Sequence, residues 1–226
     1  MPPRIALIHA VATAIPPIRH AFKEGWPEAQ VSNLLDDDLM PAYTREGGLT
    51  PHVTERICAL ALYAARTGAD AILFTCSVFP QAEDLAKQLV RIPLLKPDEA
   101  MIAAALDAGT RIGIVATNPP ATPAAAAQLV AGAKTRGVEI QVVQSVAEGA
   151  FAIGNSGDAA THDRMVVEAA GRIADKVDVI CLAQVSMAMA RAAVQARVPV
   201  PVLTSPSTAV ARLKALLTGE QRSMPV

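Results

Sequence analysis

Short aliphatic runs bounded by turn residues alternate along this chain with longer alanine-rich amphipathic stretches. Strands buried on both faces have continuous apolar positions, so this alternation is typical of a parallel sheet covered by helices. The pattern predicts strands at residues 4–9, 31–35, 71–75, 92–95, 111–116, 139–143, 177–182 and 200–203. We therefore expect an α/β fold with helices between the strands.

The clearest predicted helix covers residues 54–67. Ile57, Leu60 and Ala64 fall on one stripe of it, and Gly68 is a good C-terminal stop. Cys58 lies in this helix, and we expect it to be a small buried hydrophobic residue.

An internal repeat divides the chain into two similar halves. RIGIVA at Arg111 repeats RIALIH at Arg4 after 107 residues, and VDVICLAQ at Val177 repeats ADAILFTC at Ala69 after 108. VPVL at 200–203 follows IPLL at 92–95, and Arg164 follows Arg56, at the same 108-residue offset. The repeat predicts two pseudo-symmetric parallel-sheet lobes, residues 1–97 and 98–207, with a C-terminal helix at 208–226 packing back on the first.

Composition excludes several classes of function. The 226 residues are 52% apolar but only 3% aromatic, so the cores must be aliphatic. With 20 basic and 21 acidic side chains and no basic cluster, nucleic acid is not an expected partner, and no apolar run is long enough to cross a membrane. The first strand duplicates an internal strand, which argues against a cleaved signal peptide and for a cytoplasmic protein.

Ligands of parallel sheets bind beyond the carboxyl ends of the strands, so we expect an active-site cleft between the two lobes, lined by strand ends. The repeat pairs Cys76 with Gln184 at this edge, whereas Cys181 pairs with Leu73 in mid-strand and should be a core residue. The three cysteines form no CxxC or Cys/His pattern, so neither a disulfide framework nor a metal site is expected.

Cys76 is the candidate catalytic residue. It follows the strand AILFT and precedes a predicted helix, whose N-terminus should lower the pKa of the thiol. A thiolate there could take a proton from a carbon acid, and the thiol could return one. A buried structural cysteine is the alternative. The candidate substrate-binding residues are mostly hydroxyl and amide side chains suited to a carboxylate, with a histidine and one apolar residue: His9, Ser77, Thr117, Asn118, Thr122, Gln184, Val185 and Ser186.

For the other polar residues, structural or solvated roles are simpler interpretations than catalysis or metal binding. His9 either contacts substrate or is a hydrogen-bonded strand-end histidine. His52 and His162 precede repeat-related helices and are expected to be solvated loop residues. The run Asp36, Asp37 and Asp38 is interpreted as a solvated turn or helix cap rather than a metal site, and no phosphate-binding glycine motif occurs.

The segments AILFTC, RIGIVAT and VDVICLAQVSMA, in this order on a duplicated chain, resemble the aspartate/glutamate/hydantoin racemase superfamily, which includes arylmalonate decarboxylase and maleate isomerase. The resemblance implies cofactor-independent carbon-acid chemistry, with one cysteine per half on opposite faces of the substrate. Here Gln184 takes the place of the second cysteine, and an amide cannot transfer a proton near neutral pH.

The sequence thus predicts an isomerase or lyase for a small carboxylate or hydantoin-like substrate, with Cys76 as its single thiol acid/base. True racemisation, with His9, a water or Cys181 as the second group, is a variant. The alternative is a protein that is no longer an enzyme and that binds or senses a small anion. A homo-oligomer is compatible with the alanine-rich helices, but no interface can be identified.

Overall fold

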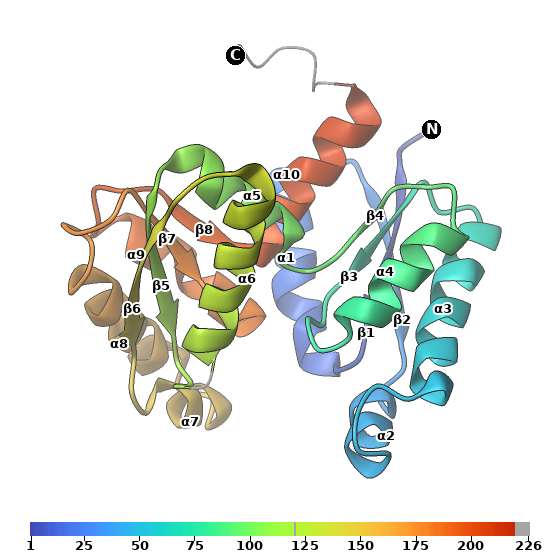
Figure 1. Cartoon of the computed structure of the whole chain (residues 1–226), viewed down its shortest axis with the longest axis horizontal. Coiled ribbons are helices and arrows are strands. Elements are labelled where there is room, and N and C mark those ends of the chain that lie inside the picture. Colours follow the sequence, from blue (N-terminus) through green and yellow to red (C-terminus); the bar gives the residue numbers. More distant parts are fainter. Residues whose placement is uncertain (120, 220–226) are drawn as a thin grey trace. The chain divides into compact units, whose positions relative to one another are not determined.

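The computed structural model describes residues 1–119 and 121–219 and divides the chain into two compact units. One comprises Met1–Glu99 and the segment from Ala209, and the other Ala100–Thr208. Each contains a four-stranded, wholly parallel sheet with flanking helices (Figure 1). The α/β fold class is therefore confirmed.

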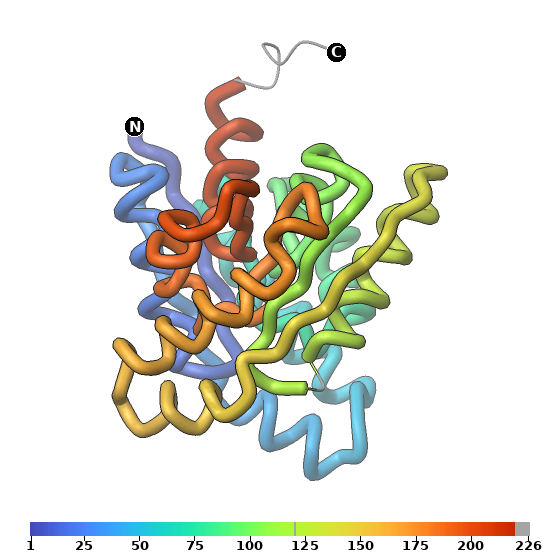
Figure 2. Tube along the Cα trace, turned by 90° about the vertical axis from the view of Figure 1, so that its left-hand side faces the viewer, coloured from blue at the N-terminus to red at the C-terminus, as the bar shows by residue number. Residues whose placement is uncertain are grey.

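The first unit has strand order β2-β1-β3-β4. Both views show α2 projecting past the carboxyl end of β2 (Figures 1 and 2). Its elements are β1 (Arg4–His9), η1 (Ala12–Ala14), α1 (Ile15–Gly25), β2 (Gln30–Leu35), α2 (Leu39–Arg45), α3 (Pro51–Arg66), β3 (Ala71–Phe74), α4 (Pro80–Leu89) and β4 (Leu94–Leu95).

The second unit repeats this order as β6-β5-β7-β8. The last helix, α10, begins in this unit and ends in the first. The elements are α5 (Glu99–Ala108), β5 (Arg111–Ala116), α6 (Ala121–Arg136), β6 (Gln141–Val146), α7 (Ala150–Asn155), α8 (Ala159–Gly171), β7 (Val179–Leu182), η2 (Val185–Ala190), α9 (Arg191–Gln195), β8 (Val202–Thr204) and α10 (Ser205–Thr218).

The same polar contact occurs at the start of the first strand in both sheets. The backbone N–H of Arg4 donates to Asp70 Oδ2 at 2.7 Å, and that of Arg111 donates to Asp178 Oδ2 at 2.9 Å. Asp178 also binds the Arg111 guanidinium, which lowers the pKa of its carboxyl. A carboxylate just before β3 or β7 thus satisfies a donor at the start of β1 or β5, so the sequence repeat is also a structural repeat.

Four strands begin two residues later than predicted. Three of them, expected at 92–95, 177–182 and 200–203, are β4, β7 and β8. The strand expected at 139–143 is β6, Gln141–Val146, because Gly137 ends α6 with a φ of +68° and leaves 138–140 in the connection. Its second half was missed because Gln144 and Ser145 interrupt the apolar pattern. Ser145 is nevertheless buried, and its hydroxyl donates to the Ala169 carbonyl at 2.8 Å.

The clearest predicted helix is confirmed as α3, which begins at Pro51, three residues earlier than expected. Thr50 caps it by accepting a bond from the Val53 N–H. Cys58 lies on its buried face, in the core of the first unit, and Cys181 lies in a core of the second unit, both as predicted. Across the described residues, no helix has the length and apolarity that a membrane crossing requires.

Gly109 lies so close to Asp178 that a side chain cannot be added without displacing it. A Cβ at this position would lie 2.5 Å from the Asp178 Cβ. We expect Gly109→Ala to lower the free energy of unfolding by about 1–3 kcal/mol, because the aspartate must move away from the donors at the start of β5. Gly171→Ala, at a helical glycine with nothing within 4 Å, is the control and should be neutral or stabilising. Urea unfolding compares the two, and equal stability would contradict the prediction.

Candidate active site

The strand order marks one position in each sheet where ligands of open α/β sheets bind. In the first sheet the connection from β1 leads to β2 on one side, and the connection from β3 leads to β4 on the other, so a crevice is expected beyond the carboxyl ends of β1 and β3. His9 is the last residue of β1, and Thr75 and Cys76 directly follow β3. The corresponding ends in the second unit, those of β5 and β7, carry Thr117 and Gln184.

His9 is completely buried and uses both ring nitrogens. Its Nδ1 lies 2.8 Å from Thr75 Oγ1, and its Nε2 lies 3.0 Å from Asn33 Oδ1. Burial lowers the pKa of the imidazole, partly opposed by the bond to Asn33. This arrangement fits the interpretation of His9 as a hydrogen-bonded strand-end histidine that fixes the ends of β1, β2 and β3. A contact between His9 and substrate stays a prediction.

Cys76 is a half-buried thiol in the turn between β3 and α4, packed against the core of the first unit. The expected lowering of its pKa is wrong. Burial raises the pKa of the thiol, a hydrogen bond with the Val78 backbone lowers it, and the carboxylates of Glu83 and Asp98 raise it further. Helix α4 begins only at Pro80, and the dipole effect fades beyond the helix end, so the N-terminus does not compensate.

Gln184 occupies the position in the second unit that corresponds to Cys76 in the first. Its Oε1 accepts two hydrogen bonds from Thr117, at 2.7 Å from the backbone N–H and at 2.9 Å from the hydroxyl. The backbone N–H can only donate, so the oxygen of the amide must face it. The two bonds fix the side chain and leave its NH₂ group as an oriented neutral donor.

The remaining predicted residues differ in exposure. Ser77 and Ser186 are exposed, and Asn118 and Val185 are half-buried. Thr122 is buried in the first turn of α6, where its hydroxyl donates to the Pro119 carbonyl at 3.0 Å. Thr122 is therefore engaged locally, whereas Thr117 and Gln184 are brought together directly.

Two side chains in the first unit were not singled out from the sequence. Asn33 binds His9 although it lies within β2, and only the strand register brings them together. Glu83 is in the first turn of α4, where acidic residues are common, so its sequence position does not indicate a functional role. It is buried, however, and its burial raises the pKa of its carboxyl to about 8.

The interpretation of two histidines as loop residues needs correction. His162 was expected in a solvated loop but is buried in the first turn of α8, because that helix begins at Ala159, and its ring lies against Gly154 of α7. His52 is exposed as expected, but it lies in the first turn of α3 rather than in a loop, and its Nδ1 lies 2.9 Å from Glu46 Oε1.

The aspartate run lies in a turn that leads into α2, as predicted, with Asp38 directly before the helix and the Asp38 N–H donating to Asp36 Oδ1 at 3.3 Å. Arg56 also binds Asp36 and Asp38.

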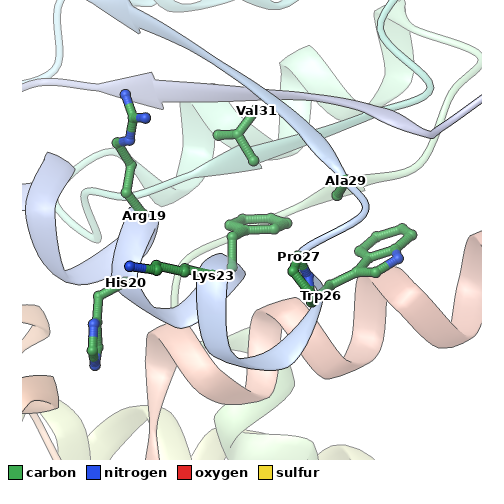
Figure 3. Close-up of a pocket in the computed structure, with 8 residues that line it drawn as sticks. Arg19, His20, Lys23, Trp26, Pro27, Ala29 and Val31 are labelled. Atoms are coloured by element: carbon green, nitrogen blue, oxygen red, sulfur yellow. The ribbon is translucent and has the colours of Figure 1, made fainter.

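A cavity of about 350 Å³ lies elsewhere in the first unit, against α1 and β2 (Figure 3). Arg19, His20 and Lys23 line it together with Trp26. None of the residues predicted for the active site lines this cavity, so it is a separate feature.

The family assignment follows from comparison of the chain with known proteins. The model of the Asp/Glu/hydantoin racemase family matches residues 18–213. The chain belongs to this family. Among curated protein sequences no match was found.

Solved structures of this family have the same fold. An allantoin racemase from Klebsiella pneumoniae is 19% identical, with a TM-score of 0.72 over 96% of this chain and 89% of its own. An aspartate racemase homologue from Pyrococcus horikoshii is 14% identical, with a TM-score of 0.72 over 96% of this chain and 100% of its own. A glutamate racemase from Bacillus anthracis is 13% identical, with a TM-score of 0.66 over 96% of this chain and 82% of its own. The resemblance inferred from the sequence is therefore confirmed, and the family supports a racemase-like enzyme.

Proposed function

We propose that this racemase-family member is a cofactor-independent isomerase or lyase that acts on a carbon α to a carboxylate or hydantoin-like group, with Cys76 as its single thiol acid/base. The observation that carries the proposal is the position of Cys76, a partly exposed thiol at the carboxyl end of β3 in a chain of this family. Gln184, the corresponding residue in the second unit, cannot transfer a proton near neutral pH.

The proposed chemistry needs a thiolate and a stabilised carbanion. The Cys76 thiolate takes a proton from the α-carbon, the C–H electron pair passes into the adjacent carbonyl group as an enolate, and the resulting thiol returns a proton to carbon. In a lyase the carbanion forms by loss of CO₂, and the thiol supplies the proton. Neutral donors can hold the substrate carboxylate without competing for the proton, which suits the NH₂ group of Gln184.

The experiment that tests this function is incubation of the protein with small α-substituted carboxylates and hydantoins in deuterated water, followed by NMR and chiral chromatography. Deuterium at the α-carbon, or loss of CO₂, supports the proposal. Deuterium in both enantiomers supports racemisation, and retention of one hand supports one-base chemistry. A ligand that raises the melting temperature without any turnover favours the second candidate, a lapsed protein that binds small anions.

We expect Gln184→Ala to raise KM for a carboxylate substrate about fivefold while kcat changes less, because a lost neutral hydrogen bond weakens binding by on the order of 1 kcal/mol. Steady-state kinetics measure this on a substrate found in the screen. Ser186→Ala, at an exposed neighbour, is the matched comparison. An unchanged KM in Gln184→Ala would remove Gln184 from the proposed binding residues.

The other expectations stay predictions. These are substrate contacts of His9, Ser77, Thr117, Asn118, Thr122, Val185 and Ser186, a cytoplasmic location, a possible homo-oligomer and the absence of nucleic-acid partners. Alanine substitution of the site residues, sedimentation and cell fractionation would examine them separately.

A further inference from the structure

The cavity of about 350 Å³ against α1 and β2 contains positive charge that the chain does not neutralise. Arg19, His20 and Lys23 of α1 line it. His20 is engaged by Glu24 one turn further along the helix, with 3.3 Å between His20 Nε2 and Glu24 Oε1. Among residues 1–119 and 121–219, by contrast, no ion pair or side-chain hydrogen bond involves Arg19 or Lys23.

Arg19 and Lys23 are placed to act on one ligand. They are four residues apart in α1, so their side chains leave the same face of the helix with their Cβ atoms about 6 Å apart. Two like charges at this spacing repel each other, and an anion between them removes that repulsion. The whole chain has a net charge of −1, so these two cations are not part of a generally basic surface.

The other end of the cavity is apolar. Figure 3 shows the cationic side chains at one end, with Trp26 and Pro27 at the other and Val31 on β2 alongside. The rings of Phe22 and Trp26 stack with their centroids 6.5 Å apart, and both side chains are buried, so this end is firmly packed. The volume is within the range of pockets that bind small molecules.

The cavity lies away from the proposed active site. Val31 pairs with Ile5, which in turn pairs with Ala71, the first residue of β3, whereas Cys76 lies beyond the last residue of that strand. A small ligand at the amino-terminal ends of the strands therefore does not contact Cys76. The cavity is also beside the second half of α1, so the helix N-terminus does not attract an anion there and the two side chains must do so.

We propose that this cavity is a second binding site, which takes a small organic anion. The carboxylate or phosphate group of the ligand lies between Arg19 and Lys23, where the guanidinium can donate two parallel hydrogen bonds and the ammonium supplies a point charge. The apolar body of the ligand rests against Trp26 and Val31. The proposal does not depend on the role proposed for Cys76.

The test uses Trp26, the single tryptophan of the chain, whose fluorescence reports directly on this cavity. The native protein is titrated with phenyl phosphate, with inorganic phosphate, which lacks the ring, and with benzyl alcohol, which lacks the charge; calorimetry repeats each titration. We expect saturable binding of phenyl phosphate, weaker binding of inorganic phosphate and weaker binding still of benzyl alcohol. No saturable binding of phenyl phosphate by either readout overturns the proposal, as does equal affinity for benzyl alcohol.

Variants locate the binding. Arg19→Gln and Lys23→Gln should each raise the Kd for phenyl phosphate about tenfold, because each removes a charge-assisted hydrogen bond. Both side chains are exposed, so the fold should not change, and Lys134→Gln, at an exposed lysine of α6, is the matched control that should leave Kd unchanged.

An unchanged Kd in Lys23→Gln overturns the proposal, as does an equal rise in Lys134→Gln. Cys76→Ala should bind phenyl phosphate like the wild type, and a raised Kd in that variant would place the anion at the active site instead. Binding that persists in a protein without turnover contradicts the proposed function alone.

Discussion

Replacing Cys76 with alanine should lower kcat/KM by about 100- to 10,000-fold, because no other thiol lies at a strand end in the described residues and proton transfer by one positioned group contributes this much. The measurement is α-proton exchange into deuterated water on a substrate from the screen. Circular dichroism and melting temperature should stay close to wild type, because Cys76 is only half-buried.

The other two cysteines serve as controls. Cys58→Ala removes a thiol from the core of the first unit, and Cys181→Ala removes one from a core of the second. Both should retain turnover, with stability losses of about 1 kcal/mol or more from the lost packing. Full activity in Cys76→Ala would exclude Cys76 as the acid/base, and loss of activity in a folded Cys181→Ala would point to that residue instead.

Glu83 should make the stability of the protein fall as the pH rises. The pKa of its carboxyl is raised from 4.5 to about 8 in the folded state. Between these values the folded state holds a proton that the unfolded state has lost, so the free energy of unfolding decreases with pH across this window and then levels off. If the whole change in pKa is expressed, the decrease from pH 4.5 to pH 8 reaches about 5 kcal/mol.

Urea unfolding at pH 5 and pH 9 measures this contribution. At pH 5 wild type and Glu83→Gln both carry an uncharged group and should have similar stability. At pH 9 Glu83→Gln should be the more stable by several kcal/mol, because it cannot bury a charge. Asp84→Asn should not change the pH dependence in this way. The same pH dependence in wild type and Glu83→Gln would show that Glu83 is ionised in the folded protein at little cost.

The fold was predictable because its signals are local. Continuous aliphatic runs separated by amphipathic stretches require strands buried on both faces and helices that cover them. The duplication then related the two halves, so that the pairing of Cys76 with Gln184 and the mid-strand position of Cys181 followed from counting residues. β6 was displaced because polar Gln144 and Ser145 belong to a strand whose buried hydroxyl has a partner on α8, Ala169.

The sequence by itself determined the α/β class, the duplication of the strands along the chain, the family and the candidate thiol. Only the tertiary structure decided the electrostatics of the site. Whether a thiol or carboxyl is charged depends on burial and on charges brought close by folding, and neither is visible in spacing along the chain. A helix predicted to begin close after Cys76 suggested a lowered pKa for the thiol, yet α4 begins only at Pro80, and burial and the charge of Glu83 raise the pKa.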